Sequence, residues 1–191
     1  VPDWYIGSCK KVKDLFPKAH AVAYVMMAFR IAWFKVYHPL AFYAAYFYRR
    51  SQKGGFDAVM MTHGMDAVKA NIEAIDGNEN ATDKDEDLLI TLEVAYEYYL
   101  RGFEFLPIDL YKSEAIRFTI EDGKLRPPFV AISGLGENAA RDLVAGREGK
   151  QFISVEEVSA ACPKVSKTHI QMLKDAGAFG SLPDTSQISF F

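Results

Sequence analysis

The chain has 191 residues, of which half are apolar and a quarter are charged, and its formal net charge is −3. This composition is typical of a globular protein with a sizeable core. Two cysteines, Cys9 and Cys162, form no CxxC pair, which excludes a disulfide framework and a zinc motif and fits a reducing cytosolic setting. We expect both to be small buried side chains. Because the sequence begins VPDWY, we expect it to be part of a longer protein.

Charge is distributed unevenly along the chain. Residues 1–60 carry a net charge of +6, residues 61–125 carry −9, and residues 126–191 are neutral overall. A basic segment beside an acidic one suggests a polyanion that is contacted by the first third only. Two solvated faces of opposite sign would give the same totals, so charge alone leaves both interpretations open.

Two apolar helices are predicted near the N-terminus. The first spans about 19–36 and ends at the His38-Pro39 step, because a residue before proline is pushed out of helical geometry. Pro39 can open the second helix, LAFYAAYFYRR. Both are apolar on nearly every side, so we expect both to be largely buried. Within 19–48 the longest uncharged runs are 11 and 13 residues, too short to cross a bilayer.

Two more helices and a hairpin follow. A helix is predicted around 58–76, and a long one begins after Thr82, a good N-cap before an acidic first turn, and ends at Gly102. The segment IRFTIEDGKLRPPF predicts a β-hairpin with Asp122-Gly123 at its turn. The fold class is therefore mainly α, with one short β-hairpin near 116–126.

From about residue 125 onward, short predicted helices alternate with glycine-containing turns. Ser154 has capping-box spacing to Glu157 for a helix at 155–161. Ser166 can cap the helix KTHIQMLKDAG, which Gly177 can end.

The stretch AISGLGENAARDLVAGREG, residues 131–149, has the signature of a helix-hairpin-helix motif. Gly134 and Gly136 allow a tight turn that exposes backbone N–H groups at a helix N-terminus, where they can hold a phosphate. Such contacts to the nucleic-acid backbone do not depend on sequence and weaken with salt. A dinucleotide-binding turn is excluded because the third glycine and a βαβ unit are missing. A glycine-rich turn that merely joins two core helices remains an equal alternative for this stretch taken alone.

A second, degenerate hairpin is one interpretation of SKTHIQMLKDAGAFGSL, residues 166–182, with Lys164, Lys167 and Lys174 as a basic rim. A helix that simply ends at Gly177 is the alternative.

The stretch FPKAHAVAY, residues 16–24, is a candidate anion site. Lys18 lies at a helix N-terminus, where a positive charge opposes the helix dipole, and a bound phosphate would explain it. A structural role for His20 is also open. His38, His63 and His169 stand alone, no catalytic signature is present, and we expect neither a catalytic nor a metal site.

Taken together, these stretches resemble the C-terminal end of the alpha subunit of bacterial DNA polymerase III, and the PolC type most closely. FPKAHAVAYVMMAFRIAWFKVYHP resembles the fingers motif, GFEFLPIDLYKSEAIRFTIEDGKLRPPFVAISGLGENAA resembles the hairpin and the duplex-binding helix-hairpin-helix, and LPDTSQISFF resembles the terminal clamp-binding peptide. Three motifs in the family's order are more specific than any one of them.

The resemblance implies a DNA-directed DNA polymerase whose palm carboxylates hold Mg²⁺ and lie outside this chain, so that this piece alone should be inactive and bind no cofactor. It implies fingers at 1–110, a duplex-binding module at 111–182 and a flexible clamp-binding tail at 183–191. The expected partners are primer-template duplex, a deoxynucleoside triphosphate, the sliding clamp and the other polymerase domains, in the cytoplasm at the nucleoid and with no membrane.

The resemblance also assigns residues to each partner. The nucleotide would be contacted by Phe16, Lys18, His20 and Tyr24. The duplex would be contacted by Ser133, Gly134, Leu135, Gly136, Asn138, Arg141, Arg147, Lys164 and Lys167. The clamp would be contacted by Gln187, Ile188, Ser189, Phe190 and Phe191.

The sequence departs from the family pattern in the tail and the turn. Ile188 and Phe190 replace leucines of the usual tail motif, and Ser133 stands where such turns often carry proline. The alternative function is a stand-alone helix-hairpin-helix adaptor of a repair or recombination complex, which would need neither the apolar N-terminal helix nor the clamp tail.

Overall fold

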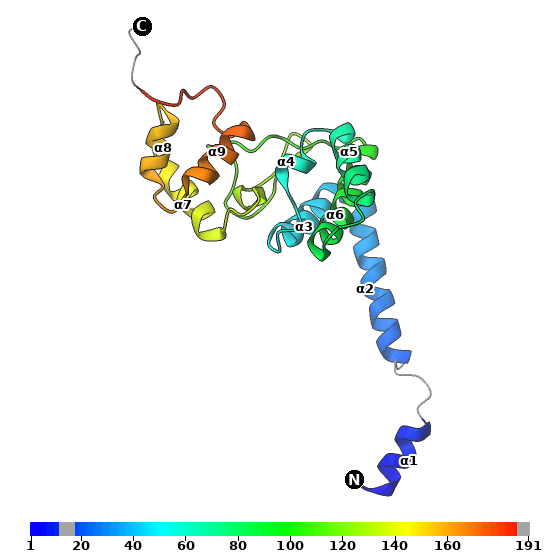
Figure 1. Cartoon of the computed structure of the whole chain (residues 1–191). Helices are drawn as coiled ribbons and strands as arrows, with labels where there is room; N and C mark the ends of the chain where they lie inside the picture. The colour runs from blue at the N-terminus through cyan, green and yellow to red at the C-terminus, as the bar shows by residue number, and fades with distance from the viewer. Residues whose placement is uncertain (12–17, 187–191) are drawn as a thin grey trace. The chain divides into compact units, whose positions relative to one another are not determined.

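The computed structural model describes residues 1–11 and 18–186. The chain falls into two compact units, Val1–Phe42 and Tyr43–Phe191, and each is described by itself. Figure 1 shows that most of the described chain is helical, and its sheet consists of two antiparallel strands. The predicted fold class, mainly α with one β-hairpin, is confirmed.

The first unit contains α1 (Asp3–Lys11), α2 (Lys18–Tyr37) and the start of α3 (Pro39–Ser51). The boundary between α2 and α3 confirms the predicted stop at the His38-Pro39 step. Aromatic rings gather at the end of α2, where the Trp33 ring centroid lies 5.2 Å from that of Tyr37 and 5.2 Å from that of His38.

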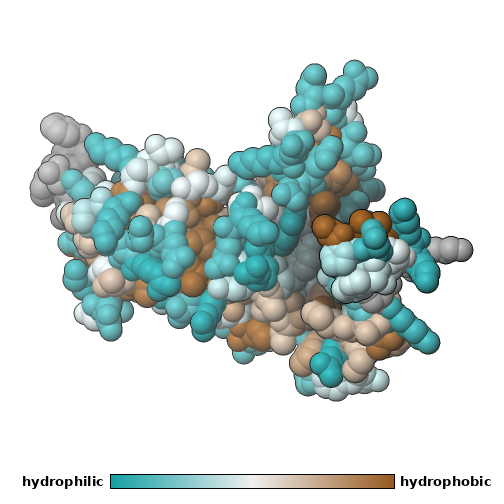
Figure 2. Space-filling view, turned by 90° about the horizontal axis from the view of Figure 1, so that it is seen from below, coloured by the Kyte–Doolittle hydropathy of each residue, from teal (hydrophilic) through white to brown (hydrophobic). Residues whose placement is uncertain are grey.

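The expectation that α2 is buried is wrong for the described chain. None of its side chains is buried within these residues, and Trp33 and Phe29 are 49% and 74% exposed. Cys9 on α1 is likewise exposed, against expectation, whereas Cys162 is buried as expected. A helix that is apolar on all sides calls for surrounding polypeptide, and the described residues of this chain do not supply it. Figure 2 shows brown apolar surface among the teal polar residues.

One described helix, α2, is long and apolar enough to cross a membrane by length and composition. This is weak evidence, because core helices of soluble proteins pass the same test. Arg30 and Lys35 lie within the helix and shorten its uncharged runs.

An aromatic core organises the first part of the second unit. Tyr43 and Phe47 from the inner face of α3 are fully buried, as is Tyr98 of α6 (Asp83–Leu100). The ring centroids of Tyr43 and Tyr98 are 5.0 Å apart in an edge-to-face arrangement, and Phe105 lies 4.6 Å from Tyr98. Such pairs add to the free energy gained from burial.

The helix predicted at 58–76 is divided into α4 (Ala58–Met61) and α5 (Met65–Asp76). Gly64 separates them with a φ of 99°, which favours glycine and which a continuous helix cannot contain. The Tyr99 hydroxyl donates to the Met61 carbonyl at 3.0 Å and accepts from the Gly64 N–H at 3.2 Å, so it bridges the break. Burial raises the pKa of Tyr99 to about 12.

Thr82 caps α6 as predicted. Its side chain accepts from the backbone N–H of Asp85, whose carboxylate accepts from the N–H of Thr82 at 2.9 Å, and this completes a capping box. These hydrogen bonds lower the pKa of Asp85. The helix ends at Leu100, Arg101 is its C-cap, and Gly102 follows with a φ of 81°.

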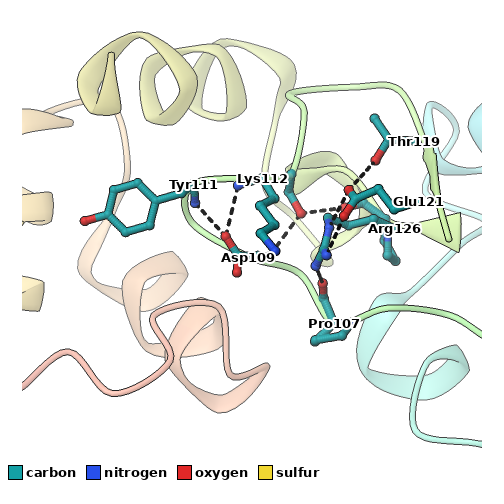
Figure 3. A network of polar contacts seen from close by, with 9 residues as sticks. Pro107, Asp109, Tyr111, Lys112, Thr119, Glu121 and Arg126 are labelled. Atoms are coloured by element: carbon teal, nitrogen blue, oxygen red, sulfur yellow. Dashed lines mark hydrogen bonds and ion pairs between the residues drawn. The ribbon is translucent and has the colours of Figure 1, made fainter. Parts of the chain in front are cut away.

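The predicted hairpin forms from β1 (Thr119–Glu121) and β2 (Lys124–Arg126), with Asp122 and Gly123 at positive φ in the turn. Figure 3 shows the network that fixes it. The Arg126 guanidinium donates two hydrogen bonds to the Glu121 carboxylate, both at 2.8 Å, and one to the Pro107 carbonyl at 2.7 Å. The bonds from Arg126 lower the pKa of Glu121. Arg126 thereby ties the hairpin to the loop that follows α6.

Ser113 is buried beside this network. Its hydroxyl accepts from the Asp109 N–H at 3.0 Å and donates to the Pro127 carbonyl at 2.9 Å. The loop is thus held to the chain that leaves the hairpin.

The C-terminal part contains a short 3₁₀ helix, η1 (Phe129–Ala131), followed by α7 (Glu137–Arg147), α8 (Val155–Ala161) and α9 (Lys167–Asp175). Ser154 caps α8 and Ser166 caps α9, as predicted. Helix α7 packs closely on the end of α8, since a Cβ placed on Gly146 would lie 2.5 Å from Cys162 Sγ.

Candidate nucleic-acid interface

The turn between η1 and α7 presents backbone at the surface. Ser133, Gly134 and Gly136 are exposed, whereas Leu135 is 4% exposed and anchors the turn in the core. Gly134 has a φ of 78°, which side-chain-bearing residues rarely adopt. Gly136 is the N-cap of α7, and no side chain of the described residues caps this helix. The first N–H groups of α7 therefore remain accessible to an anion such as a phosphate.

His169 lies against this turn, although nothing in the sequence reading connected the two. Its Nε2 is 3.5 Å from the position that a Cβ on Gly134 would occupy. Its Nδ1 is 2.9 Å from Ser166 Oγ, which also accepts the backbone N–H of His169 at 3.2 Å. The cap of α9 thus fixes the imidazole ring beside the glycine turn. The sequence signals only the contact with Ser166, because His169 follows that cap by three residues, the position from which a side chain reaches back to it.

The other residues predicted to contact DNA fall into two groups. Asn138 and Arg141 are exposed on the first turns of α7, and Arg141 makes a surface ion pair of 2.7 Å with Glu137. Lys164 and Lys167 are exposed near the start of α9. Asn138 and Arg141 lie close to the turn in sequence, Lys167 shares α9 with His169, and Lys164 precedes the cap of α9.

Arg147, by contrast, is engaged within the protein. Its Nη1 donates to the Leu110 carbonyl at 2.5 Å, and its guanidinium lies 5.6 Å from the centroid of the Phe129 ring. Burial lowers the pKa of Arg147. It occupies the last residue of the 11-residue α7, about 15 Å from the glycine turn. The structure therefore gives Arg147 a role in joining α7 to the loop before the hairpin.

A shallow depression adjoins the glycine turn. It has a volume of about 380 Å³ and is lined by Ser51 and Gln52 at the end of α3, by Ile116 and Val130, and by Leu135, Gly136 and Glu137. The end of α3 and the start of α7 therefore both border this depression.

The second hairpin forms only as far as its turn. Helix α9 ends at Asp175, and Gly177 and Gly180 follow at positive φ. Ala178 and Phe179 are buried, and the Ala178 carbonyl accepts from the Leu110 N–H at 2.8 Å. No helix follows in the described residues up to 186. Of the basic rim, Lys174 is paired with Asp184 at 2.6 Å.

The residues predicted to contact the nucleotide lie at the start of α2. Lys18 is its first residue, and the ring centroids of His20 and Tyr24 are 4.6 Å apart. All three are exposed. Phe16 lies outside the described residues, as do the residues predicted to contact the clamp, Gln187, Ile188, Ser189, Phe190 and Phe191.

The described residues contain no group of three or more His, Cys, Asp or Glu side chains that could hold a metal ion. The acidic first turn of α6 shows why nearby carboxylates do not form such a group. Asp85 is occupied by the capping box, and the neighbouring carboxylates point around the helix.

The fold and the exposed turn define a helix-hairpin-helix motif, and residues 102–187 match the family model described as a helix-hairpin-helix motif. Over its whole length, the chain is also similar to proteins named DNA polymerase III PolC-type. It is 50% identical to that of Listeria innocua and covers 13% of it, 47% identical to that of Clostridium perfringens with 13% covered, and 47% identical to that of Thermotoga maritima with 14% covered. The resemblance to PolC-type polymerases is confirmed, and the chain spans about an eighth of the length of these relatives.

Proposed function

We propose that this chain is the part of a replicative DNA-directed DNA polymerase that grips the product duplex by its backbone. The observation that carries the proposal is the exposed turn Ser133–Gly136 at the start of α7, which leaves N–H groups accessible to phosphate. Half of the residues are identical to those of a PolC-type polymerase along the entire chain. That extent of similarity favours the polymerase over a stand-alone adaptor, which would share the hairpin alone.

The duplex-binding surface consists of Ser133, Gly134 and Gly136 with Asn138 and the three exposed cations Arg141, Lys164 and Lys167. Leu135 supports the turn from beneath, being 4% exposed. Arg147 holds α7 in place and is assigned no phosphate, because its guanidinium is already bonded to Leu110. The DNA-binding module at 111–182 therefore combines backbone donors with side-chain charge.

The fingers part, 1–110, would face the incoming nucleotide. Lys18 supplies a positive charge at the start of α2, and the neighbouring rings of His20 and Tyr24, tilted at 59° to each other, offer an aromatic surface further along the helix. Phe16 would complete this wall. The triphosphate would be held jointly with Mg²⁺ on palm carboxylates elsewhere in the polymerase, so this piece alone should have no polymerase activity.

The exposed apolar surface of α2 favours an interaction in which the remaining polymerase domains cover this helix. The PolC-type relatives are about eight times as long as this chain, and polypeptide of that extent can bury the helix from all sides. Burial in the enzyme also accounts for the hydropathy of α2 without a membrane. The enzyme would work in the cytoplasm at the nucleoid.

The tail would tether the polymerase to the sliding clamp. Gln187 provides polar contacts, and Ile188, Phe190 and Phe191 provide apolar anchors, with Ser189 between them. A tether of this kind raises the local concentration of enzyme at the primer end, which is a physical basis for processivity.

The dependence of duplex binding on salt tests the proposed backbone grip. If Arg141, Lys164 and Lys167 each neutralise a phosphate, the affinity of the full chain for duplex DNA should fall roughly 40-fold between about 50 and 200 mM salt. Fluorescence anisotropy with a labelled primer-template measures this slope. Two duplexes of unrelated sequence should give the same slope. An affinity that is independent of salt would contradict the proposal.

A further inference from the structure

The chain is anchored just before the clamp-binding motif. The N–H of Val155 donates to the Pro183 carbonyl at 2.9 Å, and the N–H of Glu156 donates to the Asp184 carbonyl at 3.1 Å. The Nζ of Lys174 lies 2.6 Å from the Asp184 carboxylate. The backbone bonds use two of the N–H groups that the first turn of α8 leaves without an intrahelical partner. The first two residues of the predicted flexible tail are thus held on the helical module.

This anchor makes the tether short. Two residues, 185 and 186, separate Asp184 from Gln187, so the Cα atoms of Asp184 and Gln187 can be at most about 11 Å apart. A protein that binds residues 187–191 must therefore lie against the surface around the start of α8. A long flexible linker would impose no such restriction.

The surface beside the anchor carries an exposed apolar residue. Ile153 is 61% exposed and immediately precedes Ser154, the N-cap of α8. Its own N–H donates to the Glu157 carboxylate at 2.9 Å, which fixes the backbone at this position. Isolated apolar residues are common on protein surfaces. Ile153 differs in lying within two residues of Val155, which holds the tail.

We propose that Ile153 forms a second contact with the sliding clamp when the tail is bound. This inference rests on the clamp binding proposed above. The tail fills the clamp groove, and the short anchored tether brings the edge of the clamp onto Ile153. Because Ile153 lies beside the anchor of the tail, forming the first contact makes the second effectively intramolecular. The polymerase is thereby held by the clamp in a restricted set of orientations.

The test compares the affinity of the cognate sliding clamp for the full chain and for a free peptide of residues 185–191. The full chain should bind about fivefold more tightly than the peptide, and Ile153→Ser should remove most of that difference. Ile120→Ser is the matched control, because Ile120 is 50% exposed on β1 and should leave clamp binding unchanged. Duplex affinity, measured in parallel, should be unaffected in both variants.

Two results would overturn the inference, and they differ from each other. If the peptide and the chain bind equally and Ile153→Ser has no effect, the second contact does not exist, while tail binding stands. If neither the chain nor the peptide binds the clamp, the proposed clamp function fails and the second contact fails with it.

Discussion

At the glycine turn, the absence of a Cβ atom on Gly134 lets a phosphate approach the backbone closely. Gly134 has no Cβ and adopts a φ of 78°, and the ring of His169 fills part of the space beside it. When the Ser166 hydroxyl donates to Nδ1, the neutral imidazole carries its proton on Nε2, the nitrogen nearest the turn. We therefore add His169 to the proposed duplex-binding surface as a hydrogen-bond donor.

Replacement of His169 tests this assignment. His169→Ala should weaken duplex binding by about tenfold or more, the effect expected from one lost hydrogen bond to a charged group. The cap of α9 should survive, because it uses the backbone N–H of residue 169. His169→Gln should restore much of the affinity, since its amide can donate from nearly the same position. His63→Ala serves as the control, as His63 contacts the Val59 carbonyl instead. Equal affinities for wild type and His169→Ala would remove His169 from the surface.

Gly146 sets how closely α7 and α8 pack. An added Cβ would lie 2.5 Å from Cys162 Sγ and 3.2 Å from the Ala161 carbonyl oxygen. Gly146→Ala should destabilise the protein by about 1–3 kcal/mol despite the better helix propensity of alanine. In a Cys162→Ala background the same change should cost less, because the sulfur is gone. Urea denaturation of the four proteins measures the coupling, and identical costs in both backgrounds would show that the sulfur does not limit the packing.

At the scale of elements, the hairpin is fixed by the ion pair between Arg126 and Glu121. Arg126 is 5% exposed, so loss of its partner leaves a nearly buried charge uncompensated. The third bond of Arg126, to the Pro107 carbonyl, connects the hairpin with the loop after α6. The ion pair therefore supports the segment that leads into the glycine turn.

This ion pair should make stability depend on pH. The pKa of Glu121 is lower in the folded state than its ordinary value of 4.5, because Arg126 donates to its carboxylate. Its contribution is therefore complete above that value and is lost as the pH falls through the folded-state pKa. Glu121→Gln should cost roughly 1–3 kcal/mol at neutral pH and flatten the decline in stability below about pH 4.5. Urea denaturation as a function of pH checks this, and parallel curves for the two proteins would contradict it.

Local signals in the sequence were sufficient for most elements, and they failed where distant parts of the chain decide the outcome. Proline at 39, the caps at Thr82, Ser154 and Ser166, and the Asp122-Gly123 turn act through neighbouring backbone, so each was predicted correctly. The break at Gly64 was missed because the apolar pattern continues across it. The contact between His169 and Gly134 joins residues far apart in the sequence, which periodicity does not reveal.

At the scale of the whole molecule, the apolar pattern of α2 indicates that the helix needs cover, but it does not indicate which part of the protein covers it. Its apolar residues require a protein environment, and in this chain they are exposed among the described residues. Burial also distinguishes the proposed duplex-binding role from the proposed nucleotide-binding role. The second unit has a fully buried core, including Phe47, Leu92 and Phe129, whereas the residues on α2 that we propose to contact the nucleotide would need further polymerase domains to complete their site.

The distribution of charge agrees with this division in part. Residues 61–125, which include α5 and α6, carry a net charge of −9 and would repel a duplex. The proposed duplex-binding surface lies beyond residue 130, in a stretch that is neutral overall, and not in the basic first third where charge alone suggested a contact with a polyanion. The predicted domain borders at 110 and 182 remain predictions, as do the individual contacts to nucleotide and clamp.

The affinity of the full chain for primer-template duplex after substitution of Gly134 and Gly136 tests the central claim most directly. Gly134→Val/Gly136→Val places branched side chains on the exposed turn, one of them at a positive φ, and should reduce affinity by at least about tenfold at low salt. Circular dichroism and the urea midpoint show whether the helices persist. Loss of duplex affinity with helical content retained is the predicted result. Undiminished affinity in a folded double variant would show that this turn does not hold the DNA.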